Sequence, residues 1–168
     1  MKRRQQQPEV SDRSVRIAEV RRLQASSVGY LLIRSGQLWN ERAIRRVNAE
    51  GRGPALREAH TRFLPHLLAP DGIRITELAR RLSITKQAVQ PLVADMVEAG
   101  VLRMEDDPDD ARARRVILTA HGFAAMRHGT GILLDIEAAL GRALGKSAMA
   151  DLRRLLTTLL AELGREGA

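Results

Sequence analysis

The sequence predicts a mainly α protein that carries one small β-hairpin, and three observations support this fold class. Hydrophobic residues make up 44% of the 168-residue chain but aromatic residues only 2%, so the core must be aliphatic, which favours packed helices over a sheet sandwich. Apolar residues recur at helical spacing through most of the chain. Strand candidates are short and fall between residues 101 and 118.

The N-terminal third is expected to contain a tail and two helices. Residues 1–13 are polar, with a glutamine run, and we expect a disordered tail. Residues 14–50 have a helical pattern that a Gly-Arg-Gly-Pro stretch ends. A second helix is expected from Pro54 to about Leu68, and Pro65 should end or kink it early.

Two short helices separated by a turn are predicted next. Thr76 is expected to cap a helix that runs from Glu77 to about Leu82. Thr85 is expected to cap the second helix, and Gly100 suits the left-handed position that closes it. The apolar residues of this second helix fall on one face and are Val89, Leu92, Val93, Met96 and Val97.

The hairpin is expected from strands at residues 101–105 and 115–118. The connecting loop, DDPDDARA, is too long for a two-residue turn. Thr119 should then cap a long helix to about Leu144, and a last amphipathic helix is expected from Lys146 to Leu163.

The helices at both ends of the chain have wide apolar stripes that the small central lobe, residues 54–120, cannot bury. We therefore expect residues 14–50 and 119–164 to be dimerisation helices that pack together and against a second copy with C₂ symmetry.

Composition excludes several classes of protein. The chain has no cysteine, so it can form no disulfide or thiolate metal site, which fits a reducing cytosol. No apolar run approaches the roughly 18 residues that span a bilayer, and the basic N-terminus lacks the apolar stretch of a secretory signal. We expect a soluble, cytoplasmic protein that associates with the nucleoid and does not bind membranes.

Two helices followed by a charged hairpin predict a winged helix–turn–helix, which places one helix in the DNA major groove and a loop in the neighbouring minor groove. Gln can bond adenine, Lys can reach guanine or phosphate, and an Arg at a hairpin tip can enter a narrow minor groove. The predicted DNA contacts are Thr85, Lys86, Gln87 and Gln90 in the major groove and Asp110, Arg112 and Arg114 in the hairpin.

Charge supports this interpretation only in part. The net charge of +8 suits a polyanionic partner, but residues 1–62 hold 14 Lys and Arg against 6 Asp and Glu, whereas residues 74–118 hold 8 of each. The same Lys, Gln and hairpin charges also occur on ordinary solvated surfaces. Four acidic side chains would repel phosphate unless the loop holds them away from it: Asp106, Asp107, Asp109 and Asp110.

The segment from Thr76 to Gly122 resembles the winged helix–turn–helix of the MarR family (multiple antibiotic resistance regulators). The matching strings are ELA at 77–79, ITKQAV at 84–89, EAGVL at 98–102, DPDDAR at 107–112 and LTAHG at 118–122, of which the hairpin string is the most specific. Two positions depart from the family pattern. Pro91 replaces a residue that is often polar, and Ala111 replaces one that is often Gly or Arg.

The resemblance implies an obligate homodimer that binds double-stranded DNA at a pseudo-palindromic operator, as a repressor that a small molecule releases. It also implies an effector cleft between the dimerisation helices and the DNA-binding lobe. The larger side chains that could line this cleft are Tyr30, Trp39, His60 and Phe63, each of which could also be ordinary core.

We predict no catalytic site, cofactor or metal. His121 and His128 could share one helix face, but no short-spaced His or carboxylate cluster supports a metal site. No nucleophile–base pair or Gly-rich phosphate loop is evident. Two functions remain as alternatives to a transcriptional regulator: a winged-helix module that binds protein, and an architectural protein that binds DNA without sequence preference.

Overall fold

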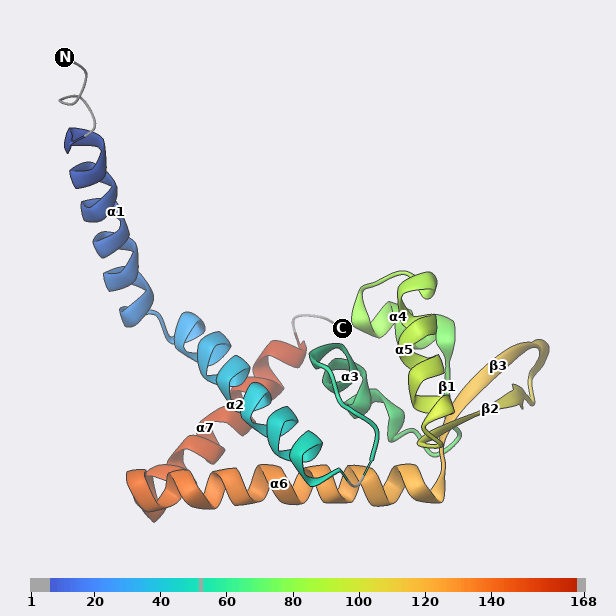
Figure 1. Cartoon of the computed structure of the whole chain (residues 1–168). Helices are drawn as coiled ribbons and strands as arrows, with labels where there is room; N and C mark the ends of the chain where they lie inside the picture. Colours follow the sequence, from blue (N-terminus) through green and yellow to red (C-terminus); the bar gives the residue numbers. More distant parts are fainter. Residues whose placement is uncertain (1–6, 52, 166–168) are drawn as a thin grey trace. The chain divides into compact units, whose positions relative to one another are not determined.

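The computed structural model describes residues 7–51 and 53–165, whose course is shown in Figure 1. The chain divides into two compact units, Met1–Glu41 and Arg42–Ala168, and each is described by itself. In the described ranges, no helix combines the length and the apolar character that a bilayer crossing requires.

The first unit contains helix α1 (Gln7–Ser26) and the beginning of helix α2 (Val28–Glu50). The sequence predicted one helical segment over residues 14–50, but the helix breaks at Ser27, whose hydroxyl accepts the backbone N–H of Tyr30 at 3.2 Å and so caps α2.

The expected disordered tail over residues 1–13 also needs correction. Residues 7–13 belong to α1, because Gln, Glu and Arg are good helix formers and Pro8 is tolerated in a first turn. Residues 1–6 lie outside the described part of the chain.

Apolar side chains of the first unit are open to solvent in the single chain. Val28 is 70% exposed, Ile33 is 65% exposed and Val15 is 64% exposed. The stripe that the sequence predicts to be a dimer contact is therefore unburied within one protomer.

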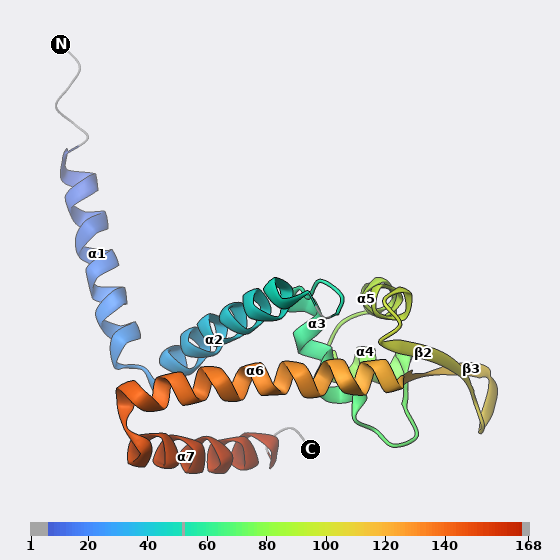
Figure 2. The ribbon, with the colours of Figure 1, turned by 60° about the horizontal axis from the view of Figure 1, so that its bottom comes forward.

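The second unit combines helices with a three-stranded antiparallel sheet in the order β1-β3-β2. Figure 2 shows α7 folding back along the long helix α6. The mainly α fold with a small hairpin is confirmed. Its elements, after the end of α2, are α3 (Glu58–Phe63), a 3-10 helix (Leu64–Leu67), β1 (Ile73–Arg74), α4 (Ile75–Leu82), α5 (Lys86–Glu98), β2 (Leu102–Asp107), β3 (Asp110–Leu118), α6 (Ala120–Leu144) and α7 (Lys146–Arg165).

One aliphatic core holds α3, α4, α5 and the sheet together. Phe63 and Leu78 are fully buried in it, and the rest of the core is almost entirely aliphatic, as the low aromatic content predicts. The cluster comprises Phe63, Leu67, Ile73, Leu78, Ala79, Leu82, Val89, Val93, Met96, Val101, Leu102, Val116 and Leu118.

The helix predicted from Pro54 begins later than expected. The side chain of Asn48 bonds both the N–H of Leu56, at 2.8 Å, and its carbonyl, at 3.0 Å, which keeps this stretch out of the helix. α3 then starts at Glu58 and gives way to the 3-10 helix that contains Pro65, as the proline predicts.

Strand β1 was not predicted, and it moves the start of α4. Residues 73–74 pair with Val116 and Arg115 of β3, so the backbone is extended up to Arg74, which takes the N-cap position. The prediction of Thr76 as the cap was therefore wrong, and Thr76 is the second residue of the helix.

Helix α5 has the predicted caps. Thr85 Oγ1 accepts the N–H of Ala88 at 3.2 Å. At the other end Gly100 has φ +69°, and its N–H donates to the carbonyl of Val97 while the N–H of Val101 donates to Met96, both at 2.9 Å. These two bonds form a Schellman motif, which ends the helix where the sequence predicts.

Pro91 lies inside α5 without ending it. A proline there has no N–H for the carbonyl of Gln87 and costs about 3 kcal/mol in an ordinary helix interior. Pro91 is exposed, so water can reach the backbone around it.

The hairpin is tighter than predicted. The turn between Asp107 and Asp110 contains two residues, so the expectation of a longer loop was wrong. The remaining loop residues belong to β3 as a bulge, because Asp107 pairs with Asp110 whereas Asp106 pairs with Arg114, which leaves residues 111–113 without partners in the register. We call this hairpin, residues 102–118, the wing.

Helix α6 joins the lobe at Val101. Its predicted cap, Thr119, accepts the N–H of Gly122 at 2.9 Å, and the N–H of Thr119 donates to the carbonyl of Val101 at 3.1 Å. Gly122 is buried so close to this carbonyl that a Cβ atom there would lie 2.1 Å from the oxygen.

Helix α7 rests on α6 and leaves most of its apolar side chains exposed. Arg153 pairs with Glu137 of α6, and no α7 side chain is fully buried. The exposed fractions reach 72% for Leu160 and 56% for Leu155.

Candidate nucleic-acid interface

The four predicted major-groove residues lie together at the N-terminal half of α5. Thr85, Lys86, Gln87 and Gln90 are all exposed, whereas Val89 and Val93 turn into the core. Amphipathic packing therefore fixes which side of α5 faces solvent. The hydroxyl of Thr85 is already used as the helix cap, so its part in the surface is to hold the first turn in place.

Asp107 is the buried centre of the wing. Its side chain has no exposed surface and accepts two bonds from Arg74, from Nε at 2.6 Å and from Nη2 at 2.9 Å. Arg115 donates to the same carboxylate from Nε at 2.6 Å, and the N–H of Asp109 donates at 2.9 Å. The hydrogen bonds from Arg74 and then Arg115 hold the pKa of Asp107 well below its usual range.

The other wing carboxylates are also engaged. Asp109 accepts a bond from Arg115 at 2.8 Å, and Asp106 lies 3.6 Å from Arg114. Asp110 accepts the backbone N–H of Arg112 at 3.0 Å, so it shapes the bulge and does not bond the guanidinium. The aspartates that the sequence presents as repelling phosphate are thus tied into the hairpin itself.

Only two of the eight cationic side chains in residues 74–118 lack an ion-pair partner among the described residues, and they are Lys86 and Arg112. In α4, Arg80 and Arg81 both bond Glu77 and lower its pKa to about 2. The four paired arginines of the strands are Arg74, Arg103, Arg114 and Arg115.

The two free cations come from α5 and the wing, and both were predicted to contact DNA. Both side chains are exposed. Arg114 was also predicted to contact DNA from the wing. Its guanidinium instead pairs with Asp106 and donates to the carbonyl of Met104 at 3.5 Å. The geometry therefore favours Arg112 over Arg114 as the wing residue available to a ligand.

A polar cluster that the sequence did not predict fixes α5 against α3. His60 is buried, its Nδ1 accepts the backbone N–H of Arg57 at 3.2 Å, and its Nε2 lies 3.3 Å from the carboxylate of Asp95 in α5. Arg57 pairs with the same carboxylate. His60 is 35 positions from Asp95 and Arg57 is 38 positions from it, and no local pattern in the sequence indicates the contact.

The four side chains predicted to line an effector cleft are divided between the two units of the chain. Phe63 and His60 are buried in the lobe and make an edge-to-face contact, with ring centroids 6.1 Å apart. Tyr30 and Trp39 belong to the other unit of the chain. The effector cleft stays a prediction for these residues.

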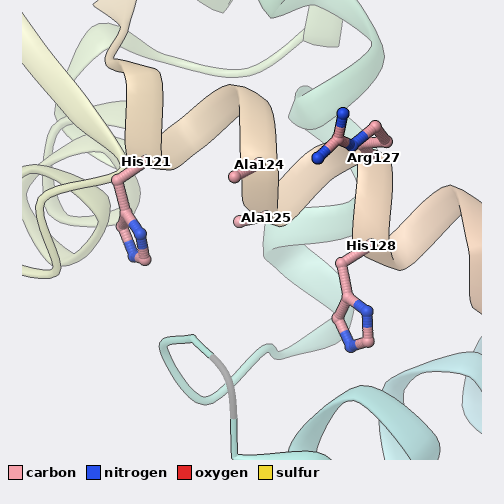
Figure 3. A pocket seen from close by; sticks show the side chains of 5 residues that line it. All are labelled: His121, Ala124, Ala125, Arg127 and His128. Atoms are coloured by element: carbon pink, nitrogen blue, oxygen red, sulfur yellow. The ribbon is translucent and has the colours of Figure 1, made fainter.

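A surface hollow of about 400 Å³ lies along α6 (Figure 3). It is lined by His121, Ala124, Ala125, Arg127 and His128, so the two histidines do share one helix face. Nε2 of His128 lies 3.0 Å from a carboxylate oxygen of Glu50 but without the geometry of a hydrogen bond. Within the described ranges, no three or more His, Asp or Glu side chains are placed to hold a metal ion.

The sequence and the fold match known proteins. Residues 57–113 match the model of the MarR family. A protein of uncharacterised function from Mycobacterium tuberculosis is 29% identical over 115 residues, which cover 64% of this chain and 80% of that protein.

Solved structures extend the likeness over most of the chain. Wild-type MarR from E. coli, in its apo form, superposes with a TM-score of 0.66 at 22% identity and covers 80% of this chain and 97% of its own. The transcriptional repressor CouR, bound to a 23-mer DNA duplex, gives 0.64 at 24% identity and covers 83% and 94%. A MarR family protein of Mycobacterium tuberculosis in complex with salicylic acid gives 0.61 at 24% identity and covers 80% and 96%.

At these identities the solved structures establish the fold, while the family match concerns the segment that holds α3, α4, α5 and most of the wing. The resemblance predicted from the sequence is confirmed: residues 57–113 match the model of the MarR family, and the chain has the fold of the solved MarR-family structures.

Proposed function

We propose that the protein is a sequence-specific DNA-binding transcriptional regulator, which acts as a homodimeric repressor on a pseudo-palindromic operator. The observation that carries the proposal is the pair of unpaired cations, Lys86 on α5 and Arg112 on the wing, in a segment, residues 74–118, whose other cationic side chains are all paired with carboxylates. A repressor of the same fold is bound to a DNA duplex, which supports DNA as the partner.

A gel shift tests this function against its two alternatives. The full-length protein is titrated onto a duplex from the region upstream of its own gene, with a scrambled competitor, at two salt concentrations. We expect retention of the specific duplex that the competitor does not displace. No binding would favour a protein-interaction module, and binding without preference and with a steep salt dependence would favour an architectural protein.

Replacing Arg112 by Ala should weaken binding to a duplex with A·T-rich flanks by about tenfold or more, since both wings of a dimer lose a contact in the minor groove. The matched control is Arg103→Ala, which removes the same charge from the same hairpin but from a side chain that is paired with Glu105. We expect this control to stay close to the wild type in a fluorescence-anisotropy titration. Equal losses in the two variants would contradict the placement of Arg112 in the groove.

The proposed homodimer is supported by the apolar residues of α7 that one protomer leaves open, with Leu160 at 72% exposure. Light scattering at micromolar concentration should give twice the 18.6 kDa mass of the chain. Leu160→Asp should shift this mass toward that of the monomer, whereas Thr158→Asp, on another side of the same helix, should not. A monomeric wild type would exclude the dimer.

The proposal includes the release of DNA by a small molecule. A solved protein of this fold is a complex with salicylic acid, and the hollow along α6 contains Arg127 and two histidines, which suit an anionic ligand.

A further inference from the structure

Four exposed residues of α5 form a surface that carries no charge. They lie at positions i, i+3, i+4 and i+7 of one helix face, on the side away from the buried residues Val89, Val93 and Met96. Pro91 is the member most nearly opposite the core. We call this surface the reading face, and its residues are Gln87, Gln90, Pro91 and Ala94.

The chemistry of the reading face suits A·T base pairs. In the major groove a Gln amide can make two hydrogen bonds to adenine, at N6 and N7, and an apolar group can pack on the 5-methyl group of thymine. Arginine, which makes the commonest specific contact to guanine, is absent from the whole of α5. Lys86 is the single cation of the helix and lies at its N-terminus, within reach of the phosphates.

Pro91 is placed to be an apolar contact and not a packing residue. Its ring is exposed, and it is not a member of the hydrophobic core cluster or of the residues packed against it. The ring is rigid, so little conformational freedom is lost when it packs on a base. A proline that weakens the helix and supports no core contact is best explained by what it meets outside the protein.

We infer that the reading face recognises A·T base pairs, with Gln87 and Gln90 bonding adenine and Pro91 packing on the methyl group of thymine. This inference rests on the proposed DNA-binding function and names the bases that the function would read. It also fits the wing, because A·T-rich DNA has the narrow minor groove that attracts an unpaired arginine such as Arg112.

The first experiment selects duplexes from a randomised library with the full-length protein. We expect A·T pairs at two symmetric major-groove positions. In the selected duplex each thymine is then replaced in turn by deoxyuridine, which removes only the methyl group. In each half-site one thymine should be sensitive to this change. Its replacement alone should weaken binding about fourfold, the equivalent of about 0.8 kcal/mol for one buried methyl group.

Two variants connect this effect to Pro91. Pro91→Ser replaces the ring with a small polar group and should abolish the sensitivity to deoxyuridine. Pro91→Val keeps an apolar side chain and should retain it. Both variants restore a backbone N–H to the helix, so both should fold with a thermal midpoint at or above that of the wild type.

The outcomes separate the inference from the function on which it rests. Selection of G·C pairs at the major-groove positions would overturn the inference, as would the same deoxyuridine effect in Pro91→Ser and in the wild type, or no deoxyuridine effect at any thymine. A library from which no duplex is retained would instead contradict the proposed function.

Discussion

Replacing Asp107 by Asn is expected to disorder the wing and to abolish sequence-specific DNA binding. The carboxylate has no exposed surface and joins Arg74 at the end of β1 to Arg115 in β3 by charge-assisted bonds. An amide keeps one acceptor oxygen but replaces the other with an NH₂ group, which cannot accept the bonds that Arg74, Arg115 and the N–H of Asp109 donate to Oδ1. It also leaves two guanidinium groups against a neutral side chain. The midpoint of thermal unfolding should fall by several degrees, and the backbone amides of residues 102–118 should exchange hydrogen faster.

The neighbouring substitution Asp106→Asn is the matched control. Asp106 belongs to the same strand but is exposed and lies 3.6 Å from its arginine, so its loss should change the thermal midpoint little. If both variants unfold like the wild type and keep their DNA affinity, Asp107 does not hold the wing together.

The depressed pKa of Asp107 gives this effect a pH signature. Because the folded-state pKa lies below that of the unfolded chain, which is about 3.9, the stabilisation is fully present above roughly pH 4 and is lost as the pH falls further. The difference in the free energy of unfolding between the wild type and Asp107→Asn should thus be constant from pH 7 to pH 5. It should shrink in urea titrations at pH 3.

Replacing Gly122 by Ala is expected to destabilise the contact between α6 and the winged-helix lobe. The new Cβ would meet the carbonyl oxygen of Val101 at 2.1 Å and a methyl carbon of Leu118 at 2.9 Å. The carbonyl cannot move freely, because it accepts the N–H of Thr119 at 3.1 Å. A cost of about 3 kcal/mol follows for such overpacking, which is roughly 10 °C in the thermal midpoint of a chain of this size.

Gly129→Ala provides the control on the same helix. Nothing lies within 4 Å of a Cβ atom at that position, so the substitution should stabilise α6 by up to about 1 kcal/mol, as expected for alanine in a helix interior. Calorimetry of both variants separates the clash from the general effect of removing a glycine. Similar shifts in the two midpoints would refute the close approach at Gly122.

Features whose cause lies within a few residues were predictable from the sequence. Thr85 and Thr119 each cap a helix by accepting an N–H three residues later, and Gly100 closes α5 by adopting a conformation that other residues avoid. Such signals depend on the backbone nearby, so the chain shows them without reference to the tertiary fold.

Features that depend on distant partners were not predictable. Strand β1 has only two residues, and it exists because Ile73 meets Val116 across the sheet. Local sequence alone favours Thr76 as the cap, because it does not show this pairing. The tight turn of the hairpin was missed for the same reason. It depends on the pairing of Asp107 with Asp110, and Asp107 is held by Arg74, which is 33 positions away.

The residues of the candidate site were predictable from the sequence, but which of their charged side chains are free of ion pairs was not. Lys86, Gln87 and Gln90 follow from helical periodicity, and all three are exposed. Which wing arginine is free could not be predicted, because the sequence does not show that Asp106 engages Arg114 while Asp110 bonds only the backbone of Arg112.

The junction at Val101 has a consequence for signal transmission. The N–H of Val101 closes α5, its carbonyl holds the first turn of α6, and the wing begins at the next residue. We therefore expect these three elements to move together, because displacing α5 or α6 breaks a hydrogen bond at the residue that leads into the wing. In the proposed dimer, a rotation of α6 would carry α5 of the same protomer with it, so the distance between the two half-sites would be set where the dimerisation helices meet and not within the lobe.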